Sequence, residues 1–158
     1  MIRVGQGYDA HQLVPKRKLI LGGVLIGFHL GLKGHSDADV LIHAIMDAIL
    51  GASGMGDIGQ HFPDSDLTFK NAKSRNFLTH VIGLVESKKF KIINIDATII
   101  CQSPKLSEFI PKMIENIAFD CKCESSQVNI KATTTEMMGF IGRSEGIAAQ
   151  CSCLIESF

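Results

Sequence analysis

The 158-residue chain lacks both a long apolar run and an excess of charge of one sign, and each absence excludes a class of protein. Lys and Arg together number 16, as do Asp and Glu, so the formal net charge is zero. Domains that bind nucleic acid or anionic membranes usually carry a basic patch, so we expect neither partner. No stretch of about 18 apolar residues is present, so no helix is expected to span a bilayer. The first residues include no apolar signal region, which predicts a cytoplasmic protein.

Linkers, repeats and low-complexity tracts are also missing, so we expect one catalytic domain over residues 1–158. The cysteines number five, an odd count that does not fit a disulfide framework in a protein that is not exported. Two Cys-x-Cys pairs are spaced more tightly than the cysteines of usual structural zinc sites. Cys151 and Cys153 fit better on the buried face of a strand, where free cysteine behaves as a small apolar residue.

Histidine and aspartate are concentrated in the first part of the chain. Up to Asp66 the sequence holds five of its six histidines and seven aspartates, but no glutamate. Short acids together with imidazoles suggest metal ligands or acid–base groups. The alternative is that aspartate is simply common in turns.

Periodicity predicts an α+β fold. The expected strands are residues 2–11, 18–26 (two strands joined by a Gly22-Gly23 turn), 90–101, 128–133 and 147–157, and the expected helices are residues 39–50, 70–88 and 105–119. Pro111 should kink the last helix. Residues 51–67 and 134–146 are predicted to be loops. We expect a four-stranded mixed sheet with the helices packed on one face.

The helix predicted over residues 39–50 is apolar nearly all round and should be buried. Ser36 or Asp37 is a plausible N-cap. Its polar residues Asp39, His43 and Asp47 follow one another at intervals of four and form a single stripe. Because buried polar groups are costly without partners, this stripe must face polar groups or a site.

Asp9 and His11 lie two residues apart near a strand end, and His43 is the natural third member of a metal site. Two imidazoles and one carboxylate suit zinc and leave a fourth tetrahedral position open for substrate or water. In the alternative, Asp9 and His11 cap a turn while His43 is a core histidine bonded to Asp47 or Asp39. The spacing alone leaves both interpretations open.

Three further segments have both a functional and a plain interpretation. Gly34–Asp39 leads into a helix N-terminus that suits phosphate, or it is an ordinary cap. Gly56–Asp66 holds three acids that suit a polyol, or it is a solvated turn. Lys131–Glu136 suits phosphate, with Glu136 as a Mg²⁺ ligand, or it is a threonine-rich strand. No P-loop pattern occurs.

Five segments occur in an order that resembles the 2-C-methyl-D-erythritol 2,4-cyclodiphosphate synthase family, over essentially the whole chain. They are Gly7–His11, Gly34–Val40 with His43, Gly56–Gly59 with Phe62–Asp64, Lys131–Glu136, and Gly139–Gly146. Met137 and Cys101 stand where many relatives are expected to have a basic and a small residue. These departures concern local contacts and leave the metal ligands intact.

The resemblance implies a homotrimer with active sites between subunits. It implies cyclisation of 4-diphosphocytidyl-2-C-methyl-D-erythritol 2-phosphate, in which the 2-phosphate attacks the β-phosphorus and CMP leaves. It also implies zinc on Asp9, His11 and His43, and Mg²⁺ or Mn²⁺ on Glu136. His35 and Thr134 would be catalytic by steadying phosphate charge.

The resemblance further implies where the substrate is held. Its implied contacts are Asp9, Ala10, His11, His35, Ser36, Asp57, Ile58, Gly59, Phe62, Pro63, Asp64, Ser65, Asp66, Cys101, Gln102, Ser103, Pro104, Lys105, Leu106, Thr133, Thr134, Thr135, Glu136, Phe140 and Arg143. Cys101–Leu106 would line a cytidine pocket, and Asp57, Gly59 and Phe62–Asp66 would hold the methylerythritol part. Phe140 and Arg143 would lie near the three-fold axis, beside a cavity for an isoprenoid diphosphate. Alternatively, Arg143 and Glu145 form a structural ion pair between subunits.

Two other functions use the same residues. A small zinc hydrolase would activate a zinc-bound water with the same triad. A metal-stabilised structural module would close its zinc with a fourth protein ligand and have no catalytic role.

Overall fold

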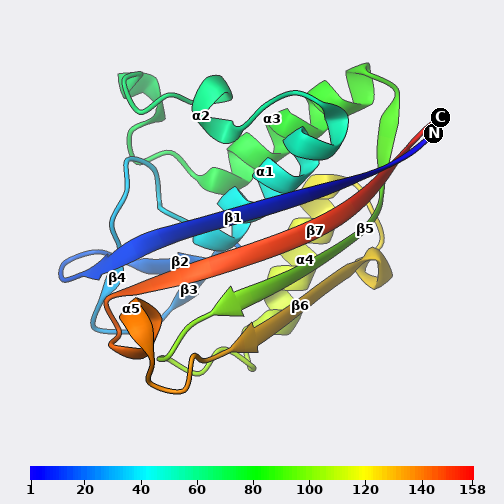
Figure 1. Cartoon of the computed structure of the whole chain (residues 1–158). Helices are drawn as coiled ribbons and strands as arrows, with labels where there is room; N and C mark the ends of the chain where they lie inside the picture. Colours follow the sequence, from blue (N-terminus) through cyan, green and yellow to red (C-terminus); the bar gives the residue numbers. More distant parts are fainter.

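Strand β1 (Ile2–Val14) is the longest strand of a mixed sheet in the computed structural model, which describes residues 1–158 (Figure 1). The sheet has five strands in the order β4-β1-β7-β5-β6, where β4 is Gly31–Leu32, β5 Phe90–Ile100, β6 Val128–Thr133 and β7 Gly146–Ser157. Neighbours are antiparallel except β5 and β6, which are parallel. Strands β2 (Leu19–Leu21) and β3 (Val24–Ile26) form a separate hairpin.

The prediction of four strands in the sheet is wrong, because β4 adds a fifth at the free edge of β1. It pairs Leu13 with Leu32 and Val14 with Gly31. A two-residue strand is too short to show an alternation of apolar and polar residues, so no sequence pattern predicts it.

Three helices cover one face of the sheet, as predicted: α1 (Val40–Ser53), α3 (Ser74–Ser87) and α4 (Ile110–Cys121) (Figure 1). On the other face of β1, Ile2, Val4 and Tyr8 are exposed. The two predicted loops are interrupted by single helical turns, α2 (Ile58–His61) and α5 (Gly139–Gly142). Two 3₁₀ turns, η1 (Leu67–Phe69) and η2 (Ser125–Gln127), complete the fold.

Pro111 does not kink a helix, because α4 begins at Ile110 and places the proline in its first turn. An N–H in the first turn of a helix has no partner within the helix, so the N–H that proline lacks breaks no hydrogen bond there.

Asp39, rather than Ser36 or Asp37, is the N-cap of α1, and its Oδ1 accepts the Ile42 N–H at 3.1 Å. The same carboxylate accepts the Gly22 N–H at 3.0 Å and the Gly23 N–H at 2.7 Å. Burial, helped by the charge of Asp37, raises the pKa of Asp39 to about 6.

Asp39 therefore joins α1 to the β2–β3 hairpin, and Asp39→Ala should lower the free energy of unfolding by about 3 kcal/mol. The variant leaves three backbone N–H groups without their acceptor, and buried unsatisfied donors cost roughly 1–3 kcal/mol each. Relief of a buried charge offsets part of this sum. Urea unfolding measures the loss. Asp57→Ala, which removes the exposed N-cap of α2, should cost less than about 1 kcal/mol, and equal losses would contradict the anchoring role.

Candidate metal centre

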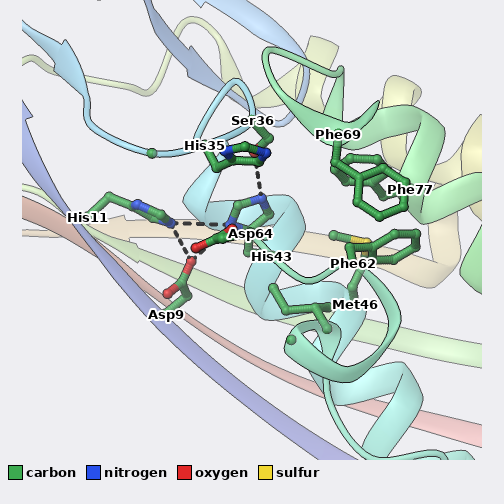
Figure 2. Close-up of a pocket in the computed structure, with 13 residues that line it drawn as sticks. Asp9, His11, His35, Ser36, His43, Met46, Phe62, Asp64, Phe69 and Phe77 are labelled. Atoms are coloured by element: carbon green, nitrogen blue, oxygen red, sulfur yellow. Dashed lines mark hydrogen bonds and ion pairs between the residues drawn. The ribbon is translucent and has the colours of Figure 1, made fainter. Parts of the chain in front are cut away.

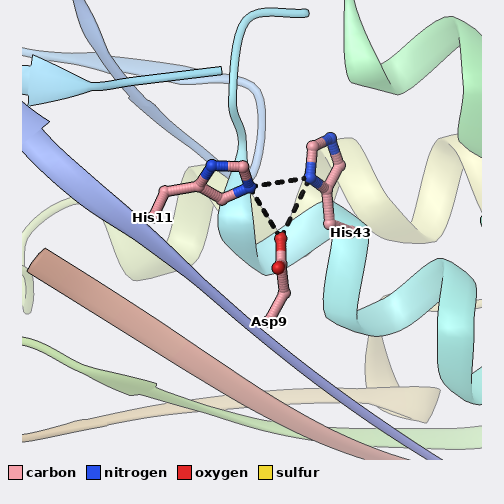
Figure 3. Close-up of side chains that lie close together, drawn as sticks. All are labelled: Asp9, His11 and His43. Atoms are coloured by element: carbon pink, nitrogen blue, oxygen red, sulfur yellow. Dashed lines mark hydrogen bonds and ion pairs between the residues drawn. The ribbon is translucent and has the colours of Figure 1, made fainter. Parts of the chain in front are cut away.

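Asp9 and His11 point from β1 toward α1, where they meet His43 (Figure 3). Asp9 Oδ2 lies 2.8 Å from His11 Nε2 and 3.1 Å from His43 Nδ1. The two ring nitrogens are 3.2 Å apart. The structure thus brings together the three residues predicted to form one site. His43 is buried, and Asp9 and His11 are half-buried.

The hydrogen bonds around the triad fit a cation at its centre. His11 Nδ1 lies 2.7 Å from the Lys33 carbonyl oxygen, which can only accept, so Nδ1 carries a proton and Nε2 is the nitrogen that can bind a metal ion. His11 Nε2 faces the Asp9 carboxylate and His43 Nδ1. The three donor atoms lie within 4.8 Å of one another, close enough to share one ion. Two imidazoles with one carboxylate, each imidazole held through its other nitrogen, match the usual surroundings of protein zinc.

The short distances between Asp9, His11 and His43 also shift the pKa values of Asp9 and His11. Burial raises the pKa of Asp9, but the hydrogen bonds and charges of His11 and His43 outweigh it and hold the pKa well below its usual range. Burial lowers the pKa of His11, but the Asp9 carboxylate outweighs it and raises the pKa overall. Without metal, the triad therefore holds protons where a cation would sit. A metal ion must displace those protons to bind.

The polar stripe on α1 serves three separate purposes. Asp39 anchors the β2–β3 hairpin, and His43 belongs to the triad. Asp47 Oδ1 accepts the Ile58 N–H at 2.8 Å and so fixes the start of α2. The prediction that the stripe must face polar partners or a site is confirmed in both senses.

A cavity of about 270 Å³ opens beside the triad (Figure 2). Besides the three ligands, its lining includes the predicted site residues His35, Ser36, Ile58, Gly59, Phe62 and Asp64. It also includes Gly34, Met46, Phe69 and Phe77, which sequence reasoning did not assign to the site. Phe77 reads in the sequence as part of an amphipathic core stripe, so nothing local marks it as a lining residue.

An aromatic cluster fixes the wall of this cavity. The Phe62 ring stacks on Phe77 at 4.4 Å between centroids and meets Phe69 edge-on at 5.5 Å. Asp66 caps η1, and its carbonyl oxygen lies 3.2 Å from His35 Nε2. The segment predicted to hold the methylerythritol part is thereby tied to α3 and to His35. Of its predicted residues, Asp57, Pro63, Ser65 and Asp66 do not line the cavity.

A second cavity of about 240 Å³ lies where β5 and β6 end. Its lining includes predicted contact residues at or just beyond the ends of these strands: Cys101, Gln102, Pro104, Lys105, Leu106, Thr133 and Thr134. These two segments meet because β5 and β6 are parallel, so their carboxyl ends share one edge. Burial raises the pKa of Cys101 to about 11, so its thiol is not a nucleophile at neutral pH.

Glu136 lies apart from the triad. It is exposed, follows β6, and adopts a positive φ of 52°. Strands β7 and β5 separate β6 from β1, so the second cavity and the triad occupy different parts of one chain. A third cavity, of about 390 Å³, is lined by Ala10, His11, Gln12, Phe140, Glu145 and Gly146. Arg143 pairs with Glu145 at 3.1 Å within the chain.

The sequence matches the YgbB family model over residues 2–156. The chain belongs to this family. A relative from Methylobacillus flagellatus, named 2-C-methyl-D-erythritol 2,4-cyclodiphosphate synthase, is 58% identical over the whole chain and 99% of its own length. A relative of the same name from Enterococcus faecalis is 56% identical over 99% of both chains.

Solved structures share the fold. The bifunctional IspDF of Campylobacter jejuni superposes with a TM-score of 0.96 at 47% identity, and the chain covers 43% of that protein. IspF of Plasmodium falciparum, solved as a CDP complex, gives 0.87 at 36% identity, covering 99% of this chain and 96% of that one. No helix in this structure combines the length and apolar character needed to cross a membrane.

Proposed function

We propose that the chain is a 2-C-methyl-D-erythritol 2,4-cyclodiphosphate synthase of the methylerythritol phosphate pathway to isoprenoid precursors. It converts 4-diphosphocytidyl-2-C-methyl-D-erythritol 2-phosphate to the cyclic diphosphate as the 2-phosphate attacks the β-phosphorus and CMP leaves. The observation that carries this proposal is the convergence of Asp9, His11 and His43 at a cavity, in a chain 58% identical to a protein of that name.

In this reaction one anionic phosphate must approach another, and their repulsion explains why the site would need metal ions and residues to hold them. Two unit charges about 4 Å apart repel by roughly 1 kcal/mol in water and by about 4 kcal/mol at an effective dielectric of 20. Zinc held by the triad, and Mg²⁺ or Mn²⁺ held by Glu136 with substrate phosphates, would supply the neutralising charge. Catalysis is then mainly positioning, because the substrate brings its own nucleophile.

The chain's own residues have the following proposed roles. His35 and Thr134 donate hydrogen bonds to phosphate oxygens. The backbone of Cys101–Leu106 receives the cytidine, with Lys105 at its edge. The aromatic-backed segment from Phe62 to Asp66 encloses the methylerythritol part and excludes water from the reacting phosphates.

The separation of the two half-sites within one chain supports a homotrimer. The substrate would span the triad and the nucleotide cavity. Its site is complete when one protomer supplies the metal and its neighbour supplies Cys101–Leu106 and Glu136. The exposed sheet face, with Ile2, Val4 and Tyr8 at 68%, 71% and 52% exposure, is the apolar surface available for that contact. The cavity beside Phe140 is then the candidate place for an isoprenoid diphosphate near the three-fold axis.

The reaction is tested by incubating the protein with this substrate and Mg²⁺ in ¹⁸O-labelled water. We expect CMP and cyclic diphosphate in equal amounts, with no label in either product. A zinc hydrolase acting through metal-bound water would instead place ¹⁸O in the product. Absence of CMP would overturn the proposal.

Glu136→Gln should slow CMP release at least about 100-fold while leaving zinc content at one per chain. The amide keeps the shape of the side chain but loses the charge that holds Mg²⁺ against the phosphates. Steady-state kinetics and elemental analysis measure the two effects. Glu108→Gln, at an exposed position before α4, is the control and should match the wild type. Unchanged activity of Glu136→Gln would favour a structural metal module.

A further inference from the structure

Ser74, the first residue of α3, has no exposed surface and bonds to two groups with its hydroxyl. One is Oδ1 of Asp37, in the loop before α1. The other is Nε2 of His43, 3.1 Å away. The serine therefore connects a carboxylate that takes no part in the triad to the buried side of a triad imidazole.

The hydroxyl of Ser74 has one proton, and its two partners decide where that proton goes. The carboxylate of Asp37 can only accept, so the hydroxyl donates to Asp37. The Ser74 oxygen must then accept from His43, which requires the proton of that imidazole to be on Nε2. Nδ1, which faces Asp9 and His11, is then the nitrogen that can bind a metal ion (Figure 3).

Asp37 is itself held rigidly. Its Oδ2 accepts the Ser74 N–H at 3.0 Å, and its Oδ1 accepts the Asp39 N–H at 3.1 Å. Its own N–H donates to the Ala72 carbonyl at 3.1 Å. Lys73, at the N-cap position of α3, makes no side-chain cap bond, so Asp37 caps this helix from a distance. The carboxylate cannot turn away from Ser74 without breaking these bonds.

We infer that Asp37 and Ser74 are positioning residues that fix the tautomer and orientation of His43 for metal binding. His11 is fixed in the opposite tautomer by the Lys33 carbonyl, so each imidazole has its own support. Ser36 Oγ also approaches His43 Nε2, at a longer 3.4 Å, and already accepts the Ala38 N–H at 3.2 Å (Figure 2). This inference rests on the metal centre of the proposed function and names what holds its third ligand.

The affinity of Ser74→Ala for zinc tests whether Asp37 and Ser74 position His43 for metal binding. Loss of an outer partner of a metal-bound histidine typically weakens binding 10- to 100-fold, and we expect a loss in that range for zinc. Competition between zinc-loaded protein and a chromophoric chelator measures it. Ser87→Ala, at an exposed position near the end of the same helix, is the matched control and should keep wild-type affinity. At saturating zinc, the CMP release of Ser74→Ala should recover to within a few-fold of the wild type.

A second readout is independent of both activity and metal. In the metal-free protein, long-range ¹H–¹⁵N spectra distinguish the protonated ring nitrogen of His43 from the bare one. The wild type should carry a proton on Nε2, donated to Ser74, whether or not Nδ1 is also protonated toward Asp9. Asp37→Ala frees the Ser74 hydroxyl to donate to Nε2, so its His43 should shift toward the Nδ1-protonated form and bind zinc more weakly.

Two results would overturn the inference: a wild-type His43 that carries no proton on Nε2, or a folded Ser74→Ala protein with unchanged zinc affinity and an unchanged spectrum. If Ser74→Ala does not fold, the inference is still tested by the protonation of wild-type His43 and by the spectrum and zinc affinity of Asp37→Ala. Failure of the proposed function looks different, because a protein that forms no CMP would still show the Nε2 tautomer and its dependence on Asp37.

Discussion

His43→Ala should remove bound zinc and reduce CMP release by at least about 1,000-fold. The triad offers three donors within 4.8 Å of one another, and a site with two donors on a half-exposed strand cannot hold the ion against water. The substitution also leaves the Asp9 carboxylate facing the diphosphate without a neutralising cation. A cost of this size corresponds to about 4 kcal/mol of lost transition-state stabilisation.

Elemental analysis and CMP release on the same preparations measure both effects. His29→Ala replaces an exposed histidine and should keep one zinc per chain and wild-type activity. If His43→Ala kept its activity without zinc, the triad would be a structural feature and the catalytic centre would lie elsewhere. If it kept zinc, a fourth protein ligand would have to exist, as in a closed structural site.

The long elements of the fold could be predicted because their periodicity is strong. Strands β5, β6 and β7 and helices α1 and α3 lie within a few residues of their predicted positions. The short elements could not, because β4 and α5 are held by tertiary contacts rather than by any pattern of their own. The N-cap of α1 was misplaced for a related reason. Asp39 is favoured over Asp37 by partners in the distant β2–β3 hairpin.

The members of the triad could be proposed as ligands because a strand period of two pairs Asp9 with His11 and a buried helix stripe marks His43. That the two halves meet depends on how α1 packs against β1, which is why the spacing alone left a capping interpretation open. The surroundings of the triad are not predictable in this way. Ser74 and Phe77 lie on a helix whose sequence shows an ordinary amphipathic pattern, yet one contacts His43 and the other lines the cavity. Their roles follow only from how α3 packs against α1.

The close approach of α1 to β1 depends on Gly5 and Gly7, and this packing places His43 opposite Asp9. A Cβ atom added at Gly7 would overlap the Ala44 carbonyl oxygen and lie 2.8 Å from the Ala48 backbone nitrogen. Both are backbone atoms of a helix that is buried along most of its length, so no side chain can turn aside to make room. Either the helix or the strand must move.

Gly7→Ala should therefore lower the free energy of unfolding by about 4 kcal/mol, beyond the usual 1–3 kcal/mol of overpacking. That is a large part of the 5–15 kcal/mol available to a typical domain. Because the displaced helix carries His43, zinc affinity should fall as well in whatever protein remains folded. Urea unfolding and chelator competition measure the two losses. Gly83→Ala is the matched control: its Cβ meets nothing within 4 Å on the exposed face of α3, so the same substitution should stabilise the protein by about 0.5–1 kcal/mol. Equal effects at the two glycines would show that close helix–strand packing does not build this site.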